Sequence, residues 1–195
     1  MGLGYKSKQG TEGIPVFQGT GKDIQLAQGG FLLEKGGLPD GTIIKAGTPM
    51  RFDESTRKAT FVATGKIVEA AAADATNYKI AKGHTLKVGD NFAAKPSDKA
   101  YPITAINTSN PDYDVVTVGT TIGALTVDSF VFGSTTTGED NSSFGGVKGL
   151  LYSDRVVGDG ESCSVAVRAT VYARRIPYSV ELEEALPRII FSQSY

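Results

Sequence analysis

The chain of 195 residues is long enough to bury a sizeable core as one large domain or two small ones, without disulfide staples. Its 20 basic and 21 acidic side chains balance, so no field of one sign would steer nucleic acid, and we expect no nucleic-acid partner. No window approaches the roughly 18 apolar residues of a membrane span, and we expect no membrane partner.

The residue types favour strands over helices. The sequence holds 24 glycines, eight tyrosines and nine phenylalanines, together with many valines, isoleucines and threonines. We therefore predict an all-β fold, built from small barrel or sandwich units with short strands. The first residues, Met1 to Lys8, contain no apolar run, so we expect no secretory export signal.

Residues 1–30 contain eight glycines and few periodic apolar positions, too few to offset the entropy of ordering the backbone. They predict an extended N-terminal arm that orders only against a partner. Strand signals separated by turns then recur from Phe31 to Val68, and we assign 31–76 as a first β segment.

Residues 77–133 carry the clearest alternation and predict a small β-barrel-like unit. Alternation at period two directs Leu86, Val88 and Phe92 toward a core. The stretch Leu86–Phe92 is echoed by Leu125–Phe130 with one glycine deleted, a pattern typical of two related edges of one barrel, although chance similarity is an alternative.

Residues 134–146 are polar and glycine-rich and predict a linker or loop. Residues 147–195 predict a C-terminal β segment that packs with 31–76, in which the single cysteine, Cys163, is a core residue. Ser179 is a suitable N-cap for one short helix that ends before Pro187, and a last apolar strand follows it.

The apolar residues of this C-terminal helix and strand need more partner surface than one small sheet offers. We therefore expect them to form the interface between copies of the chain. The residues of this predicted oligomer interface are Leu182, Leu186, Ile189, Ile190 and Phe191.

No residue pattern predicts a reaction centre, a cofactor site or a metal site. The single histidine, His84, has no nucleophile or orienting acid near it in the sequence. Asp112 with Asp114, and Asp154 with Asp159, lack the spacing of a calcium loop, and no phosphate-binding glycine motif is present. We expect a protein that is not an enzyme, although a pair of carboxylates that cleaves polysaccharide would leave no sequence signature.

Four arginines lie close together in the last third of the sequence. Arg174 and Arg175 follow one predicted strand, and Arg168 and Arg188 lie near them in the chain. They form either a basic patch that meets an acidic partner surface or a set of solvated and internally paired charges.

Four stretches taken in order resemble the capsid-surface proteins of tailed bacteriophages, the head-decoration and head-fibre proteins, especially those of crAss-like and other gut phages. The similarity spans about residues 40–195. It rests on Lys45–Met50, Tyr78–His84 with Lys87–Asp90, Tyr101–Gly119 and Val165–Val171.

This resemblance implies a virion protein on the outer capsid surface, bound to the major capsid protein and commonly trimeric, with head-fibre proteins as further partners. It would stabilise the shell or anchor a projection without a cofactor. The alternative is a carbohydrate-binding adhesin that recognises host-surface glycans, in which Tyr101, Tyr113 or Tyr152 stacks against sugars. A polysaccharide-degrading enzyme is the third hypothesis.

Overall fold

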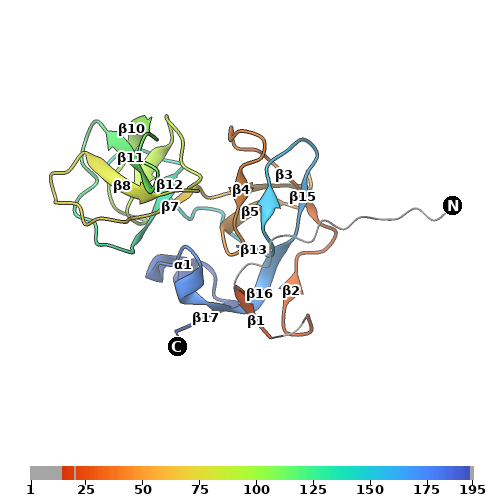
Figure 1. Ribbon diagram of the computed structural model, residues 1–195. Coiled ribbons are helices and arrows are strands. Elements are labelled where there is room, and N and C mark those ends of the chain that lie inside the picture. The colour runs from red at the N-terminus through yellow and green to blue at the C-terminus, as the bar shows by residue number, and fades with distance from the viewer. Residues whose placement is uncertain (1–14, 20, 194–195) are drawn as a thin grey trace.

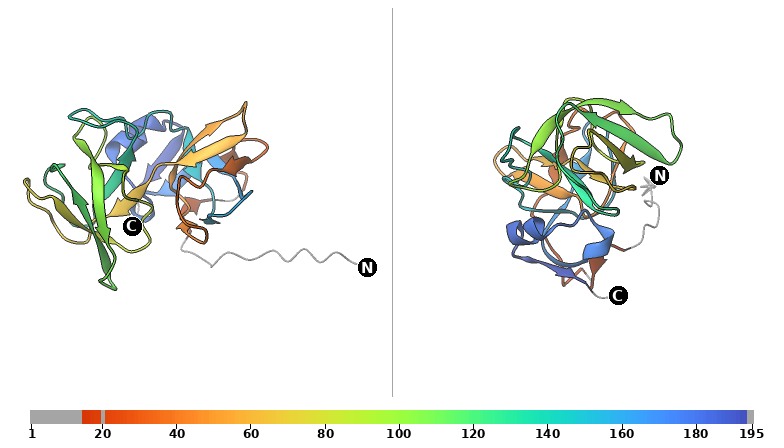
Figure 2. Two further views of the ribbon diagram at one scale, coloured as in Figure 1. Left: turned by 90° about the horizontal axis from the view of Figure 1, so that it is seen from above. Right: turned by 90° about the vertical axis from the view of Figure 1, so that its left-hand side faces the viewer.

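The computed structural model describes residues 15–19 and 21–193. Short strands dominate, with one α-helix and one 3-10 turn, which confirms the all-β class with a short C-terminal helix. The strands form two β units that lie side by side (Figures 1 and 2). Within the described ranges, no helix has the length and apolar character needed to cross a bilayer.

The first unit is a nine-stranded sheet built from both ends of the chain. Its central path runs β1-β16-β13-β5-β6-β3-β15, and β2 and β17 also pair with β16. Because Ser164 alone separates β15 from β16, the path curls back toward its own beginning. The strands are β1 (Phe17–Gln18), β2 (Gln25–Leu26), β3 (Phe31–Leu33), β5 (Pro49–Asp53), β6 (Lys58–Phe61), β13 (Gly149–Leu151), β15 (Ser162–Cys163), β16 (Val165–Tyr172) and β17 (Ile189–Ser192), with a separate ribbon of β4 (Ile43–Ile44) and β14 (Arg155–Val156).

The second unit is inserted between β6 and β13 and is a six-stranded barrel in the order β7-β12-β9-β10-β11-β8. An antiparallel bridge between Ile67 and Ile80 joins its two ends. A side chain at Gly65 would come within 2.7 Å of Ile80 and 2.9 Å of Leu86, so glycine permits this closure. The strands are β7 (Thr64–Lys66), β8 (Asn77–Ala81), β9 (Asn91–Ala93), β10 (Ala100–Asn107), β11 (Tyr113–Val118) and β12 (Phe130–Ser134).

The barrel begins earlier than the sequence predicted. The predicted boundary at residues 76 and 77 is wrong, because β7 already pairs with β12. The prediction for Val88 is also wrong: Leu86 and Phe92 are buried, but Val88 is 57% exposed. The chain turns between Lys87 and Asp90, where the backbone N–H of Asp90 donates to the carbonyl of Lys87, and this turn breaks the strand alternation.

The echoed stretches lead into neighbouring strands. Each precedes a strand of the barrel, and those two strands, β9 and β12, pair with one another. Leu86 and Leu125 are both buried, whereas Val88 and Val127 are both exposed. The two stretches therefore have the same pattern of buried and exposed side chains, and they lead into neighbouring strands of the barrel.

Residues 134–146 are not a loose linker. The Asn141 side chain is buried and donates to the carbonyls of Lys95 and Asp98, at 2.5 and 2.8 Å. Phe144 packs edge-on against Phe132, with ring centroids 4.8 Å apart. These contacts fix the segment to the barrel and to the core.

The predicted N-terminal arm, residues 1–30, includes residues that belong to the folded first unit. Residues 1–14 and 20 lie outside the described residues, so the structure does not address that part of the prediction. The remainder includes β1 and β2, which pair with β16. The apolar side chains of Phe17, Ile24 and Leu26, in or next to these strands, are partly buried, a feature that the high glycine content obscured.

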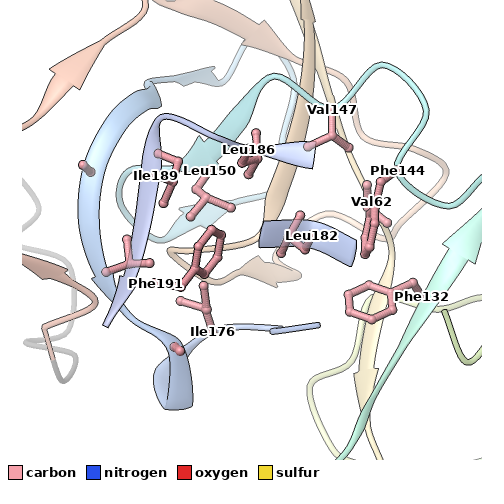
Figure 3. Packing of buried hydrophobic residues seen from close by; sticks show 13 residues of the cluster. Val62, Phe132, Phe144, Val147, Leu150, Ile176, Leu182, Leu186, Ile189 and Phe191 are labelled. Atoms are coloured by element: carbon pink, nitrogen blue, oxygen red, sulfur yellow. The ribbon is translucent and has the colours of Figure 1, made fainter. Parts of the chain in front are cut away.

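The C-terminal helix lies between the two units. Helix α1 (Val180–Ala185) is capped by Ser179, whose Oγ accepts from the backbone N–H of Leu182 at 3.1 Å, as predicted. A 3-10 turn, η1 (Ala173–Arg175), precedes it. Figure 3 shows that Leu182 and Phe191 point into the same cluster as Phe132 of the barrel. The helix therefore joins the barrel to the first unit through a shared core.

Candidate functional site

The predicted oligomer interface is largely an intramolecular core. Leu182, Leu186, Ile189 and Phe191 are between 0% and 6% exposed and belong to the cluster shared by the two units. Only Ile190 remains outside, and it is 65% exposed. The prediction is wrong for the four buried residues, because the strands of the first unit, together with Phe132 of the barrel, supply the partner surface that the sequence seemed to lack.

The parallel pairing of β16 and β17 brings two arginines together. Ala169 pairs with Ile189 and Thr170 pairs with Ile190. Arg168 and Arg188, one residue before each member of the first pair, line the same hollow. On its other side, Arg168 pairs with Gln25 of β2. These residues line a shallow hollow of about 350 Å³, together with Lys22. We call this surface the basic face, formed by Lys22, Gln25, Arg168, Thr170, Arg188 and Ile190.

The cations of the basic face have no partner of their own. Among the described residues, the side chains of Lys22, Arg168 and Arg188 make no hydrogen bond, ion pair or ring contact. Asp23 also lines the hollow and has an interaction of its own, and the lining holds more positive than negative side chains. The three cations line one hollow, and like charges close together repel one another. An anionic partner would relieve this repulsion.

The other two arginines of the sequence cluster lie apart from the basic face. Arg175 donates from Nη1 to the carbonyl of Pro15 at 2.5 Å and stacks 4.1 Å above the ring of Tyr172. Arg174 faces the cleft between the two units. The sequence thus indicated a basic patch of four arginines. In the structure only two of them, Arg168 and Arg188, line the basic face, and Lys22 lines it with them. The strand alternation that puts Arg168 and Thr170 on one face was the available signal.

The cleft between the units is the largest cavity described, at about 590 Å³, and lies between the barrel and α1. Most of the charged side chains that line this cleft lie near a side chain of opposite charge. Lys66 pairs with Asp128 at 2.7 Å, and Lys95 approaches Glu181 at 3.9 Å. This cleft offers less uncompensated charge to a ligand than the basic face does.

His84 has an orienting acid that the sequence did not reveal. Asp114 of β11 lies beside it, with Oδ2 3.2 Å from His84 Nε2, and Lys82 lies 2.5 Å from the other carboxylate oxygen. The Nδ1 atom accepts from the backbone N–H of Leu86 at 3.2 Å. The neutral ring therefore donates from Nε2 and accepts at Nδ1, the arrangement of a histidine that links the turn at 82–86 to β11.

Burial also lowers the pKa of His84, and this effect outweighs the opposing attraction of Asp114. The same cause raises the pKa of the Cys163 thiol, which lies in the core of the first unit, as predicted. Both groups are thus held in their neutral forms at neutral pH.

The carboxylates considered for calcium are engaged by cations and amides. Asp154 accepts from the backbone N–H of Ala46 at 2.8 Å and pairs with Lys45, and Asp159 pairs with Lys35 at 2.7 Å. Asp114 is held by Lys82 and His84. In residues 15–19 and 21–193, no group of three or more His, Cys, Asp or Glu side chains could hold a metal ion.

The tyrosines considered for sugar stacking do not share a surface. Tyr101 and Tyr113 lie on β10 and β11 of the barrel, whereas Tyr152 packs against Phe17 in the first unit, with ring centroids 5.4 Å apart. The Tyr101 hydroxyl is hydrogen-bonded to Glu139 at 2.9 Å, and Lys79 covers the ring of Tyr113. These contacts do not build a common aromatic platform.

Comparison with protein-family models, with curated proteins and with solved structures gave no match to this chain. The basic face is therefore characterised by its own chemistry. It combines two arginines and a lysine with an exposed isoleucine, on a sheet whose other side chains, among them Ala169 and Val171, belong to the shared core.

Proposed function

We propose that this protein is a structural component of a virion, a head-decoration or head-fibre protein that binds the outside of a bacteriophage capsid. It docks through the basic face onto an acidic surface of the major capsid protein. The observation that carries the proposal is that Arg168 and Arg188 line one hollow and that their side chains have no partner among the described residues. The virion setting comes from the resemblance of the sequence to capsid-surface proteins.

The chemistry of the basic face suits a protein partner. Guanidinium groups bind carboxylates through two parallel hydrogen bonds, so the adjacent arginines favour a planar, directional contact. Ile190 beside them adds apolar area, which a protein–protein contact buries at its centre. The barrel and the β4–β14 ribbon remain free to project outward as a decoration.

Charge reversal at the basic face tests this proposal. Capsids lacking the protein are mixed with wild-type protein or with Arg168→Glu/Arg188→Glu, and binding is measured by co-sedimentation. We expect the double variant to lose at least about tenfold in affinity, because each lost charge-assisted contact contributes on the order of 1.5–3 kcal/mol.

The matched control is Arg174→Glu, which reverses another exposed arginine that has no partner among the described residues. It should bind capsids as the wild type does. Binding by the double variant at wild-type affinity would refute docking through the basic face. Absence of the protein from imaged virions would refute the virion assignment itself.

A further inference from the structure

The cleft between the two units has two fixed walls. On the barrel side, Phe130 begins β12 and pairs with Lys66 of β7. On the other side, Tyr178 donates from its hydroxyl to Glu183 at 2.8 Å and packs against Phe191, with ring centroids 5.7 Å apart. Both aromatic side chains line the cleft and are partly buried against the shared core. Contacts outside the cleft hold each wall, so a ligand would meet a site that is already formed.

The charged side chains of the cleft leave one cation without a partner. Lys66 pairs with Asp128 at 2.7 Å, and Lys95 lies 3.9 Å from Glu181. Arg174 is exposed, and its side chain makes no hydrogen bond, ion pair or ring contact among the described residues. The lining therefore holds three cations and two carboxylates, an excess of one positive charge. A ligand with a single negative charge complements it.

The size and the apolar lining of the cleft indicate a small ligand with a ring. Its volume of about 590 Å³ lies within the range of roughly 300–1,000 Å³ that small-molecule sites occupy, commonly where two units meet. Ala94 on the barrel side and Ala173 on the other side line it together with Phe130 and Tyr178. Aromatic rings attract one another beyond the area that they bury, so these walls favour an aromatic body.

We propose that this cleft is a second binding site, for a small aromatic molecule that carries one carboxylate or sulfonate group. The ring packs against Phe130 and Tyr178, and the anion meets the guanidinium group of Arg174. This site shares no lining residue with the basic face. The proposal therefore goes beyond capsid docking and does not depend on it.

The same lining suits a sugar or a nucleotide less well. A sugar needs several hydrogen bonds, but both serines of the lining are already engaged. Ser129 donates to the carbonyl of Thr126 at 2.6 Å. Ser179 accepts from the backbone N–H of Leu182 at 3.1 Å. A nucleotide carries several negative charges, more than the unpartnered Arg174 balances.

Two matched fluorescent probes test the proposal on the full-length protein. Anilinonaphthalene sulfonate has an aromatic body with one negative charge, and N-phenylnaphthylamine has the same rings without the sulfonate. Both fluoresce more strongly in an apolar site, so fluorescence titration gives the affinity of each. We expect saturable binding of the sulfonate at one site per chain.

Variants then locate the site. Arg174→Gln should weaken binding of the sulfonate about fivefold and leave the affinity of the neutral probe unchanged, because it removes only the charge. Arg188→Gln is the matched control at the basic face and should change neither affinity. Ala94→Phe, which fills the cleft, should weaken both probes. Gln193→Trp, at an exposed position of the same lining, serves if Ala94→Phe does not fold.

Three outcomes would overturn the proposal. The first is sulfonate binding that Arg174→Gln leaves unchanged or that Arg188→Gln weakens instead. The second is an equal loss for both probes in Arg174→Gln, because the anion would then have no part in recognition. The third is the failure of the wild-type protein to bind either probe. Each of these outcomes leaves the capsid-docking proposal to its own test at the basic face.

Discussion

His84 shows how one buried side chain couples the stability of this fold to pH. Its two ring nitrogens are both used, one toward Asp114 and one toward the Leu86 amide. A proton added at Nδ1 would break the hydrogen bond from Leu86 and place a charge in a desolvated position near Lys82. The folded protein therefore takes up this proton less readily than the unfolded chain does.

The sign of the pH dependence follows from the lowered pKa of His84. Below the ordinary value of 6.5 the unfolded chain binds a proton that the folded protein does not, so the free energy of unfolding should fall as the pH falls. The slope should not exceed about 1.4 kcal/mol per pH unit, the limit for one proton. Urea unfolding at several pH values between 8 and about 5 measures it.

His84→Gln is the control for this measurement, because the chain has no other histidine. The variant should be less stable at pH 8 but should lose the slope between about pH 6.5 and 5. Asp53, whose pKa is lowered to about 2 by hydrogen bonds from Ser55, titrates below this window. An unchanged slope in the variant would show that His84 is not the group responsible.

At the scale of single elements, neighbouring residues of β17 have different roles: Phe191 contributes to the core, and Ile190 contributes to the exposed basic face. Phe191 is 6% exposed and packs against Tyr178, with ring centroids 5.7 Å apart, whereas Ile190 faces solvent. The alternation of one short strand therefore separates stability from binding. A change at one position should leave the property of the other intact.

Phe191→Asp and Ile190→Asp form a matched pair that tests this separation. The first should lower the free energy of unfolding by about 3–5 kcal/mol or more, because it buries an unpaired carboxylate and leaves a cavity. The second should change stability by no more than about 0.5 kcal/mol. Chemical denaturation of both variants measures the difference. Similar losses in the two variants would contradict the assignment of the strand faces.

At the scale of the whole molecule, the two β units share one core. Phe132 of the barrel is fully buried in the cluster that also holds Leu182, Phe144 and Phe191. Val62, just before the barrel begins, belongs to the same cluster. This contact predicts that the barrel and the first unit unfold together.

Calorimetry tests this coupling. The wild type should unfold in one transition whose calorimetric and van't Hoff enthalpies agree. Phe132→Ala should cost about 3–5 kcal/mol and should separate the transitions of the two units. Val131→Ala removes a buried side chain from the interior of the barrel instead and should destabilise without separating them. Two transitions in the wild type would contradict a shared core.

The sequence by itself determined the local features of this protein. Apolar residues that alternate between glycine-containing turns specified an all-β chain. Ser179 and the acidic residues after it specified the C-terminal helix. Both signals could be recognised because turns, strand alternation and helix caps depend on residues that are close together in the sequence. The same alternation placed Arg168 and Thr170 on one strand face. These features require no knowledge of distant contacts.

Only the tertiary structure decided which surfaces are inside and which charges meet. Leu182 and Phe191 look like an interface in the sequence, but residues of the first unit and Phe132 of the barrel cover them, and nothing near them in the chain indicates this. Arg168 and Arg188 come to line one hollow through the parallel pairing of β16 with β17, and His84 comes to lie beside Asp114 through the antiparallel pairing of β8 with β11. Burial and pairing between distant segments depend on how the whole chain packs, so residue patterns alone leave them open.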